Sequence, residues 1–220
     1  WVKVSGVAWA GRGFFYSRYP APAPGGELST KNVDHRVYYH RIGTPQSQDE
    51  EVFADPEHPE RFHMVDVTED EHFAILEVSD RGAGKKGNAL FYRDLTKKNP
   101  RFVPIVADVS DTTYTVVGND ADRFLILVND KPNGRIVSFD TSAPADRAWS
   151  DVVAERPEPI ESVGTVGDRL FVTYLKDVTS KVSIFDLSGG SERELPLPGL
   201  GTVSGFSGHS CATDAFYTFT

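Results

Sequence analysis

The chain of 220 residues has only one cysteine, Cys211. A lone cysteine has no partner within the chain, so no intrachain disulfide can form and stability must come from packed side chains. This scarcity is compatible with a reducing compartment. It favours a cytoplasmic protein and leaves a periplasmic one open.

Long apolar runs and an excess of positive charge are also absent. No stretch is apolar over enough residues to cross a bilayer, so we expect no membrane-spanning segment. The formal net charge is -9, whereas nucleic-acid binding relies on lysine and arginine to displace the counterions of the phosphates. The composition therefore argues against both membrane and nucleic-acid partners.

Signatures of catalysis and of metal or cofactor binding are incomplete. Segment 82–87 reads G-x-G-x-x-G, but a predicted strand follows it where a dinucleotide site needs a helix. Segment 205–209 resembles a nucleophile elbow, except that His209 stands where the pattern requires glycine. The histidines lack the spacing to cysteine or carboxylates that a zinc site needs; they are His35, His40, His58, His63, His72 and His209. We predict no catalytic residue, no metal and no cofactor in this chain.

Helical periodicity is missing as well, because no segment sustains an apolar period of 3.6 residues. A strand-turn-strand pattern recurs instead, most clearly at 160–187, where β-branched and aromatic residues partly alternate with polar ones. Its copies are separated by roughly 45 to 60 residues, the period of a four-stranded propeller blade. The anchor residues of successive copies are Phe15, Phe73, Phe124, Leu170 and Ala215.

This period predicts an all-β protein, a β-propeller of four-stranded antiparallel blades. Blades are expected at 1–56, 62–108, 112–154 and 160–198, with the start of a fifth at 202–220. Strand aromatics, Trp9 and Trp149 included, are expected in the core, and acidic clusters such as 48–51 on solvated edges. Asn133-Gly134 predicts a two-residue hairpin turn.

One connection is too long for an ordinary hairpin. Residues 20–32 are rich in proline and glycine, which cannot continue a strand ladder, so we expect an exposed loop there. Long loops on rigid sheets often carry function. A tolerated surface insertion is the alternative interpretation.

Several stretches of the chain resemble the propeller domain of the prolyl oligopeptidase family: WVKVSGVAW, SRYPAP, YYHRIGTPQSQDE, YLKDVTSKVSIFDL, LPLPGLGTVSGFSG and FYTFT. The likeness extends from about Trp1 to Thr220. It implies a seven-bladed propeller, of which this chain matches blades three to six and the start of the seventh. In that family the propeller is stacked on an α/β-hydrolase domain with a Ser, Asp, His triad, which cleaves short peptides on the carboxyl side of proline.

The resemblance also implies sites and partners. The hydrolase domain has no counterpart in this chain, so no triad residue is carried over. Residues 20–33 align with a flexible loop of the family near the domain interface, which makes Pro24, Gly25, Gly26 and Lys31 candidate gating residues. Phe62, Arg81 and Gly82 align near positions that line the far part of the peptide site. The expected partners are the protein's own hydrolase domain and short proline-containing peptides, in a full-length monomer.

Two alternatives remain open. The chain could be a free-standing propeller that serves as an interaction scaffold, or the propeller of a related oligopeptidase that prefers basic residues. The sequence that follows Thr220 in the parent gene distinguishes them. A G-x-S-x-G motif with later Asp and His residues favours a peptidase, and a stop codon favours the scaffold.

Overall fold

The computed structural model describes residues 1–80, 84–143 and 148–220. The first sheet contains β1 (Ala8–Ala10), β2 (Gly13–Arg18), β3 (Arg36–Arg41) and β4 (Glu50–Phe53), and the second contains β5 (Phe62–Val67), β6 (Phe73–Ser79), β7 (Asn88–Asp94) and β8 (Val103–Val106). The third sheet contains β9 (Tyr114–Asp120), β10 (Arg123–Val128), β11 (Arg135–Asp140) and β12 (Trp149–Val153). The fourth contains β13 (Ile160–Val166), β14 (Arg169–Lys176), β15 (Thr179–Asp186) and β16 (Arg193–Glu194), and the last pairs β17 (Val203–Ser207) with β18 (Phe216–Phe219).

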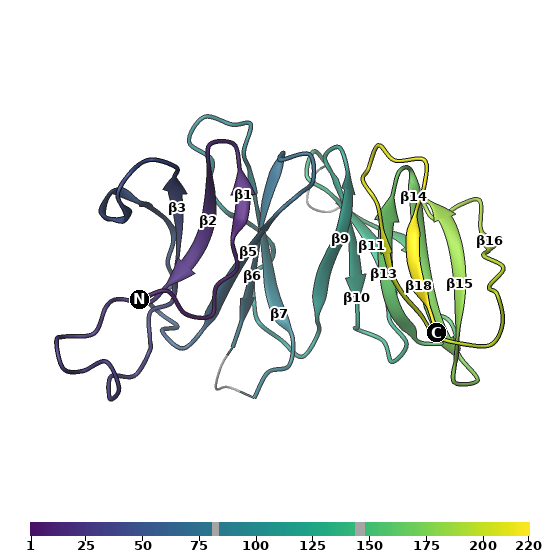
Figure 1. Cartoon of the computed structure of the whole chain (residues 1–220), viewed down its shortest axis with the longest axis horizontal. Helices are drawn as coiled ribbons and strands as arrows, with labels where there is room; N and C mark the ends of the chain where they lie inside the picture. Colours follow the sequence, from purple (N-terminus) through teal and green to yellow (C-terminus); the bar gives the residue numbers. More distant parts are fainter. Residues whose placement is uncertain (81–83, 144–147) are drawn as a thin grey trace. The chain divides into compact units, whose positions relative to one another are not determined.

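Within each four-stranded sheet, consecutive strands are antiparallel neighbours (Figure 1). Among the described residues, the one helical element is a single 3-10 turn at Gln46–Gln48. The prediction of an all-β protein made of four-stranded antiparallel sheets is confirmed. No helix in the described part of the chain is long and apolar enough to cross a membrane.

The chain divides into two compact units, Trp1–Thr112 and Thr113–Thr220. In the first unit, the core lies between the sheets β1–β4 and β5–β8. Strand alternation places Phe15 and Val37 on one side of the first sheet, where they pack in the same cluster as Leu76 and Ala89 of the second. All four side chains are buried. Their removal from water is the main favourable contribution to packing of the two sheets.

The core of the second unit also consists of apolar side chains packed between two sheets. Leu125 and Ile136, from the sheet β9–β12, cluster with Leu170 and Phe185, from the sheet β13–β16. A smaller cluster packs Phe171 and its neighbours against the pair β17–β18. Apolar residues at alternate positions of a strand therefore determine which face of each sheet is covered.

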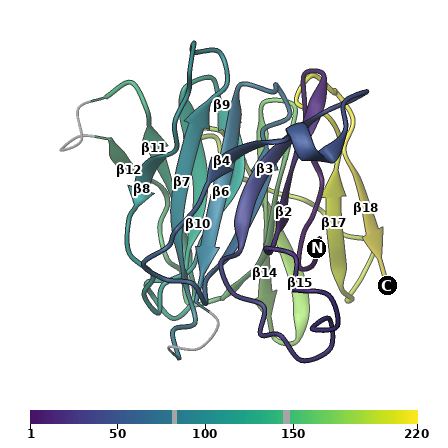
Figure 2. The ribbon, with the colours of Figure 1, turned by 90° about the vertical axis from the view of Figure 1, so that its left-hand side faces the viewer.

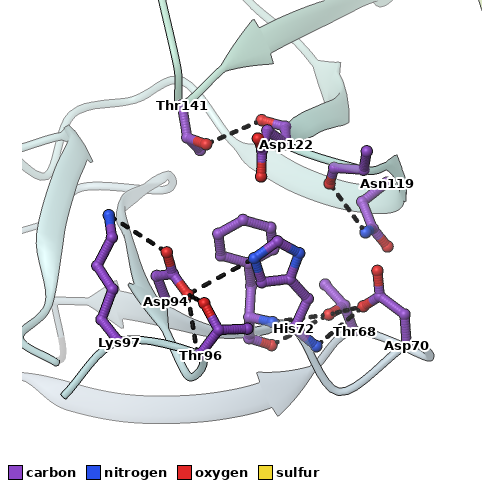
Figure 3. A network of polar contacts seen from close by, with 11 residues as sticks. Thr68, Asp70, His72, Asp94, Thr96, Lys97, Asn119, Asp122 and Thr141 are labelled. Atoms are coloured by element: carbon purple, nitrogen blue, oxygen red, sulfur yellow. Dashed lines mark hydrogen bonds and ion pairs between the residues drawn. The ribbon is translucent and has the colours of Figure 1, made fainter.

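A recurring aspartate ends the third strand of three sheets, at Asp94, Asp140 and Asp186. In the last of these, the Asp186 carboxylate accepts hydrogen bonds from the backbone N–H (2.9 Å) and hydroxyl (2.5 Å) of Ser188. These bonds, with others to the same turn, lower the pKa of Asp186 to about 2. Figure 3 shows the equivalent carboxylate of Asp94, which accepts bonds from Thr96 and also lies 3.5 Å from Nε2 of His72. Hydrogen bonds to the aspartate side chain therefore stabilise the turn that leads from the third strand to the fourth.

Two tryptophans expected in the core are instead exposed. Trp9 is 60% exposed and Trp149 39%. Ala8 and Ala10 are buried, so alternation along β1 directs Trp9 to the opposite face, where its ring packs edge-on against Phe14. Trp149 begins the edge strand β12. The prediction failed because aromatic character does not reveal which face of a strand is covered.

The predicted two-residue hairpin at Asn133-Gly134 is also wrong. Val128 pairs with Arg135, so residues 129–134 form a longer connection. Gly134 does adopt the left-handed conformation, with φ 74°. The Asn133 amide, however, donates to the carbonyl oxygen of Arg156 at 2.8 Å, outside the hairpin. Within the connection, the Gly134 N–H instead donates to the Lys131 carbonyl at 3.2 Å.

Candidate functional site

The loop of residues 20–33 joins β2 to β3 and extends beyond the ends of both strands (Figures 1 and 2). The predicted gating residues Pro24, Gly25 and Gly26 lie in a local turn, in which the Gly26 carbonyl accepts the N–H groups of Ser29 (3.1 Å) and Thr30 (2.9 Å). Gly25 has φ 85°, a conformation that favours glycine. Most of the loop is exposed. Its own hydrogen bonds are thus those of a turn rather than of a sheet.

The base of the loop, in contrast, is fixed to its surroundings. The Trp1 indole donates to the side-chain oxygen of Asn32 at 2.7 Å, and the Asp34 N–H donates to the carbonyl of Pro59 at 2.8 Å. Lys31, the fourth predicted gating residue, forms an ion pair with Glu60. Because both charged groups are substantially exposed, that ion pair contributes at most about 1 kcal/mol. The neutral contacts at the loop base are therefore the stronger anchors.

Two buried histidines, His35 and His63, connect the loop base to the second sheet through hydrogen bonds. The backbone N–H of His63 donates to Nδ1 of His35 (2.9 Å), and Nδ1 of His63 lies 2.6 Å from the carbonyl oxygen of His35. The two rings stack with centroids 5.9 Å apart, and Ser17 of β2 donates its hydroxyl to the His63 carbonyl at 2.6 Å. These reciprocal bonds tie the residue before β3 to the second residue of β5.

The same bonds determine the tautomers of both rings. His35 accepts at Nδ1, so its proton is on Nε2, which faces the Lys3 carbonyl at 3.3 Å. His63 donates from Nδ1, so its Nε2 carries a lone pair; this atom is buried and has no hydrogen-bond partner among the described residues. A second proton on His63 would therefore place an unpaired charge in the interior.

Burial keeps both imidazoles neutral. It lowers the pKa of His63 to about 4, although the hydrogen bond to the His35 carbonyl acts in the opposite direction. Burial also lowers the pKa of His35. At neutral pH, the pair is a structural anchor rather than a source or acceptor of protons.

Phe62 begins β5 at this same position. Its ring meets His35 edge-on, with centroids 5.9 Å apart, and it pairs in register with Ser79 at the end of β6. Ser79 therefore ends β6 at the same end of the second sheet as Phe62. Of the other residues predicted with Phe62, Arg81 and Gly82 lie outside the described residues. The structure thus brings Phe62 together with the base of the 20–33 loop.

A second polar cluster was missed by the sequence analysis. Asp49 belongs to the acidic segment expected on a solvated edge, yet its side chain is fully buried. Its carboxylate accepts hydrogen bonds from the Tyr16 hydroxyl (2.5 Å) and from Nδ1 of His40 (2.8 Å). Burial, together with the bond to Asp49, raises the pKa of Tyr16 to about 12. The expectation of a solvated edge is wrong for Asp49, because the 46–48 turn folds it back over β2.

Neither this cluster nor the histidine pair was visible as a motif. The histidine pair joins residues 28 positions apart, and its bonds are to backbone atoms, which no sequence spacing encodes. Within the described residues, no three His, Cys, Asp or Glu side chains come together as a metal site would require. Ser207, in the segment that resembles a nucleophile elbow, ends β17 and pairs with Phe216 of β18.

Comparisons with known proteins match this chain over its whole length. A family model described as prolyl oligopeptidase, N-terminal beta-propeller domain, matches residues 1–220. A prolyl endopeptidase of Elizabethkingia meningoseptica is 38% identical over all of this chain and 30% of its own length. Prolyl oligopeptidase A of Amanita bisporigera is 30% identical, over 93% of this chain and 28% of its own length.

Solved structures agree with the sequence comparisons. A structure from a structural and mechanistic analysis of two prolyl endopeptidases has a TM-score of 0.88 and 32% identity, covering all of this chain and 31% of the other. Prolyl oligopeptidase B of Galerina marginata, bound to a 35mer hydrolysis and macrocyclization substrate, has a TM-score of 0.85 over all of this chain and 31% of its own. At 23% identity, this second likeness shows the fold alone. The chain spans about a third of the length of these proteins.

Proposed function

Because this chain belongs to the prolyl oligopeptidase family, as an N-terminal β-propeller domain, we propose that it controls which peptides reach the catalytic residues of a proline-specific serine endopeptidase. The cleavage itself, on the carboxyl side of proline, takes place in a hydrolase domain outside this chain. The partners of the chain are that domain and short proline-containing peptides. The full-length protein acts as a cytoplasmic monomer.

One observation carries this proposal: the 20–33 loop is fixed at its base and exposed at its tip. The base is held by the buried His35–His63 pair, whereas Leu28 near the tip is fully exposed. A gate needs a rigid hinge and a segment that can move without disrupting the core. The loop meets both requirements, because its tip contributes no strand to either sheet.

Phe62 supports the same proposal from the adjacent strand. It is an apolar, half-buried ring of the second sheet that contacts His35 at the base of the loop. Such a ring can contact a peptide side chain some distance from the scissile bond. It would strengthen binding of longer peptides without taking part in the chemistry.

Shortening the loop tests the gating role. In the full-length protein, deletion of residues 23–30 should raise kcat/KM for long peptides by at least about threefold and leave short chromogenic peptides unchanged, because only the gate is altered. Deletion of Lys97 and Lys98, in the connection that follows β7 at the end of the second sheet opposite Phe62, is the control. Unchanged discrimination between long and short peptides would contradict gating by this loop.

Replacing Phe62 tests whether this residue affects peptide binding, measured as KM, more than the chemical step, measured as kcat. Phe62→Ala in the full-length protein should raise KM for peptides of about six or more residues by roughly threefold to tenfold, with a smaller decrease in kcat. Phe62→Leu preserves an apolar contact and should give a smaller rise. Steady-state kinetics on a matched short and long peptide measure the difference. Equal kinetics of wild type and Phe62→Ala on the long peptide would remove Phe62 from the peptide site.

A further inference from the structure

Arg93 is a buried cation in the first unit, on β7. Its relative exposure is 9%, and it lies on the side of β7 that faces the sheet β1–β4. The guanidinium carbon is 5.8 Å from the ring centre of Phe15 and 5.9 Å from that of Phe102. These rings attract the cation weakly and remove it from water. Burial lowers the pKa of Arg93.

The guanidinium makes no hydrogen bond to any of the described residues. Its Nε is buried and unpartnered, and the nearest carboxylate oxygen, on Glu50, is 3.8 Å from Nη2. The Glu50 side chain is itself 67% exposed. An arginine taken out of water without hydrogen-bonded partners is costly. The N–H donors of its two Nη groups are therefore available to an incoming acceptor, whereas the buried Nε is not.

Other partly buried arginines of the chain are bonded in the usual way. Arg156 forms a bidentate pair with Glu192, at 2.7 and 2.8 Å. Arg135 bonds to Asp130 and to Asp151. Arg93 is less exposed than either residue and has no hydrogen-bonded acceptor in the described part of the chain. Arg93 therefore has donors to spare, because its ionic partner Glu50 lies beyond hydrogen-bond distance.

Arg93 also lines a groove of about 580 Å³ between β4 and the 99–102 segment. Arg101 and Asn99 lie on the second side of the groove, and Glu50 and Glu51 on the first. Glu51 already accepts bonds from Arg36 (2.9 Å) and from the Tyr38 hydroxyl (3.1 Å). Glu50 is therefore the one lining carboxylate that must move when an anion enters.

We propose that this groove binds a carboxylate, held by the guanidinium of Arg93 with Arg101 and Asn99 at the rim. The forked donors of arginine match a planar carboxylate in a bidentate arrangement. A more highly charged anion is disfavoured, because the two glutamates line the same groove. The carboxylate can come from a small organic acid or from the C terminus of a peptide, which share this chemistry.

Acetate is the first probe, used with the full-length protein. At equal ionic strength, about 50 mM acetate should raise Tm relative to chloride, because a ligand that binds only the folded state stabilises it. Arg93→Met should abolish the response and Arg93→Lys should reduce it, since lysine keeps the charge but loses the fork. Arg123→Met removes a cation of the second unit that does not line this groove. It is the control for net charge and should respond as the wild type does.

Calorimetric titration completes the test. Affinity for acetate should fall at least about tenfold in Arg93→Met, the loss expected when a bidentate pair is removed. An equal Tm response in wild type and Arg93→Met would overturn the proposal, and so would tighter binding of sulfate or phosphate than of acetate. A proline-free tripeptide with a free C terminus, compared with its amide, then identifies the source. If the tripeptide with a free C terminus binds and its amide does not, the carboxylate is that of a peptide C terminus. If acetate binds and neither tripeptide does, it is that of a small organic acid.

Discussion

Replacing His63 with asparagine is expected to flatten the pH dependence of stability between pH 6.5 and 4. In the folded chain, burial lowers the pKa of His63 to about 4, whereas an unfolded histidine titrates near 6.5. Between these values the unfolded state binds a proton that the folded state does not. The stabilisation is complete above pH 6.5 and is lost progressively as pH falls towards 4, by about 3 kcal/mol in all.

Asparagine is the informative replacement because its amide can still donate to the His35 carbonyl while carrying no titratable group. His35 itself, whose pKa is also lowered by burial, will retain part of the pH dependence. The charges of Asp55 and Arg61 near His63 act in opposite directions, so they leave the sign unchanged. Urea unfolding between pH 7.5 and 4.5 measures the effect.

The control for His63→Asn is His209→Asn, in which an exposed imidazole is removed. It should retain the wild-type pH dependence. If His63→Asn loses as much stability as the wild type between pH 6.5 and 4, the buried pair is not the origin of the effect. Proteolysis within residues 20–33 should also accelerate as pH falls over this range in the wild type, because charging His63 weakens the anchor of the loop.

Gly189→Ala is expected to destabilise the second unit by about 3 kcal/mol or more. Gly189 has φ 88°, a conformation that L-residues with a side chain rarely adopt. A Cβ at this position would also lie 1.9 Å from the carbonyl oxygen of Val152 on β12. Backbone cannot move aside as a flexible side chain can, so either the turn or β12 must shift.

The turn around Gly189 is itself well anchored. Asp186 accepts N–H bonds from Ser188 and from Gly190, both at 2.9 Å, which leaves little freedom for rearrangement. Gly199→Ala is the matched control, since its φ is not positive and, among the described residues other than its chain neighbours, no atom lies within 4 Å of the added Cβ. Chemical unfolding of both variants should separate them by at least about 2 kcal/mol. Equal stabilities would mean that the turn adapts to a side chain.

The repeated strands were predictable because their cause is local. β-branched and aromatic residues at alternate positions favour strands wherever they occur, and a turn such as Gly167-Asp168 separates β13 from β14 as its residues indicate. The proline-rich loop was predictable for the same reason, since 20–33 contains the residues that cannot join a ladder. The sequence alone therefore determined the strands, their order and the position of the loop.

Tertiary structure decided which side chains became buried and what they met. Trp9 is exposed and Asp49 buried, contrary to their chemical character, because each outcome depends on the face that a neighbouring segment covers. The His35–His63 anchor arises from contacts between the first two sheets, and so does the burial of the Arg93 guanidinium beside Phe15. Such contacts depend on how two sheets pack in space, and the free energy of burial depends on that packing rather than on the order of residues along one strand.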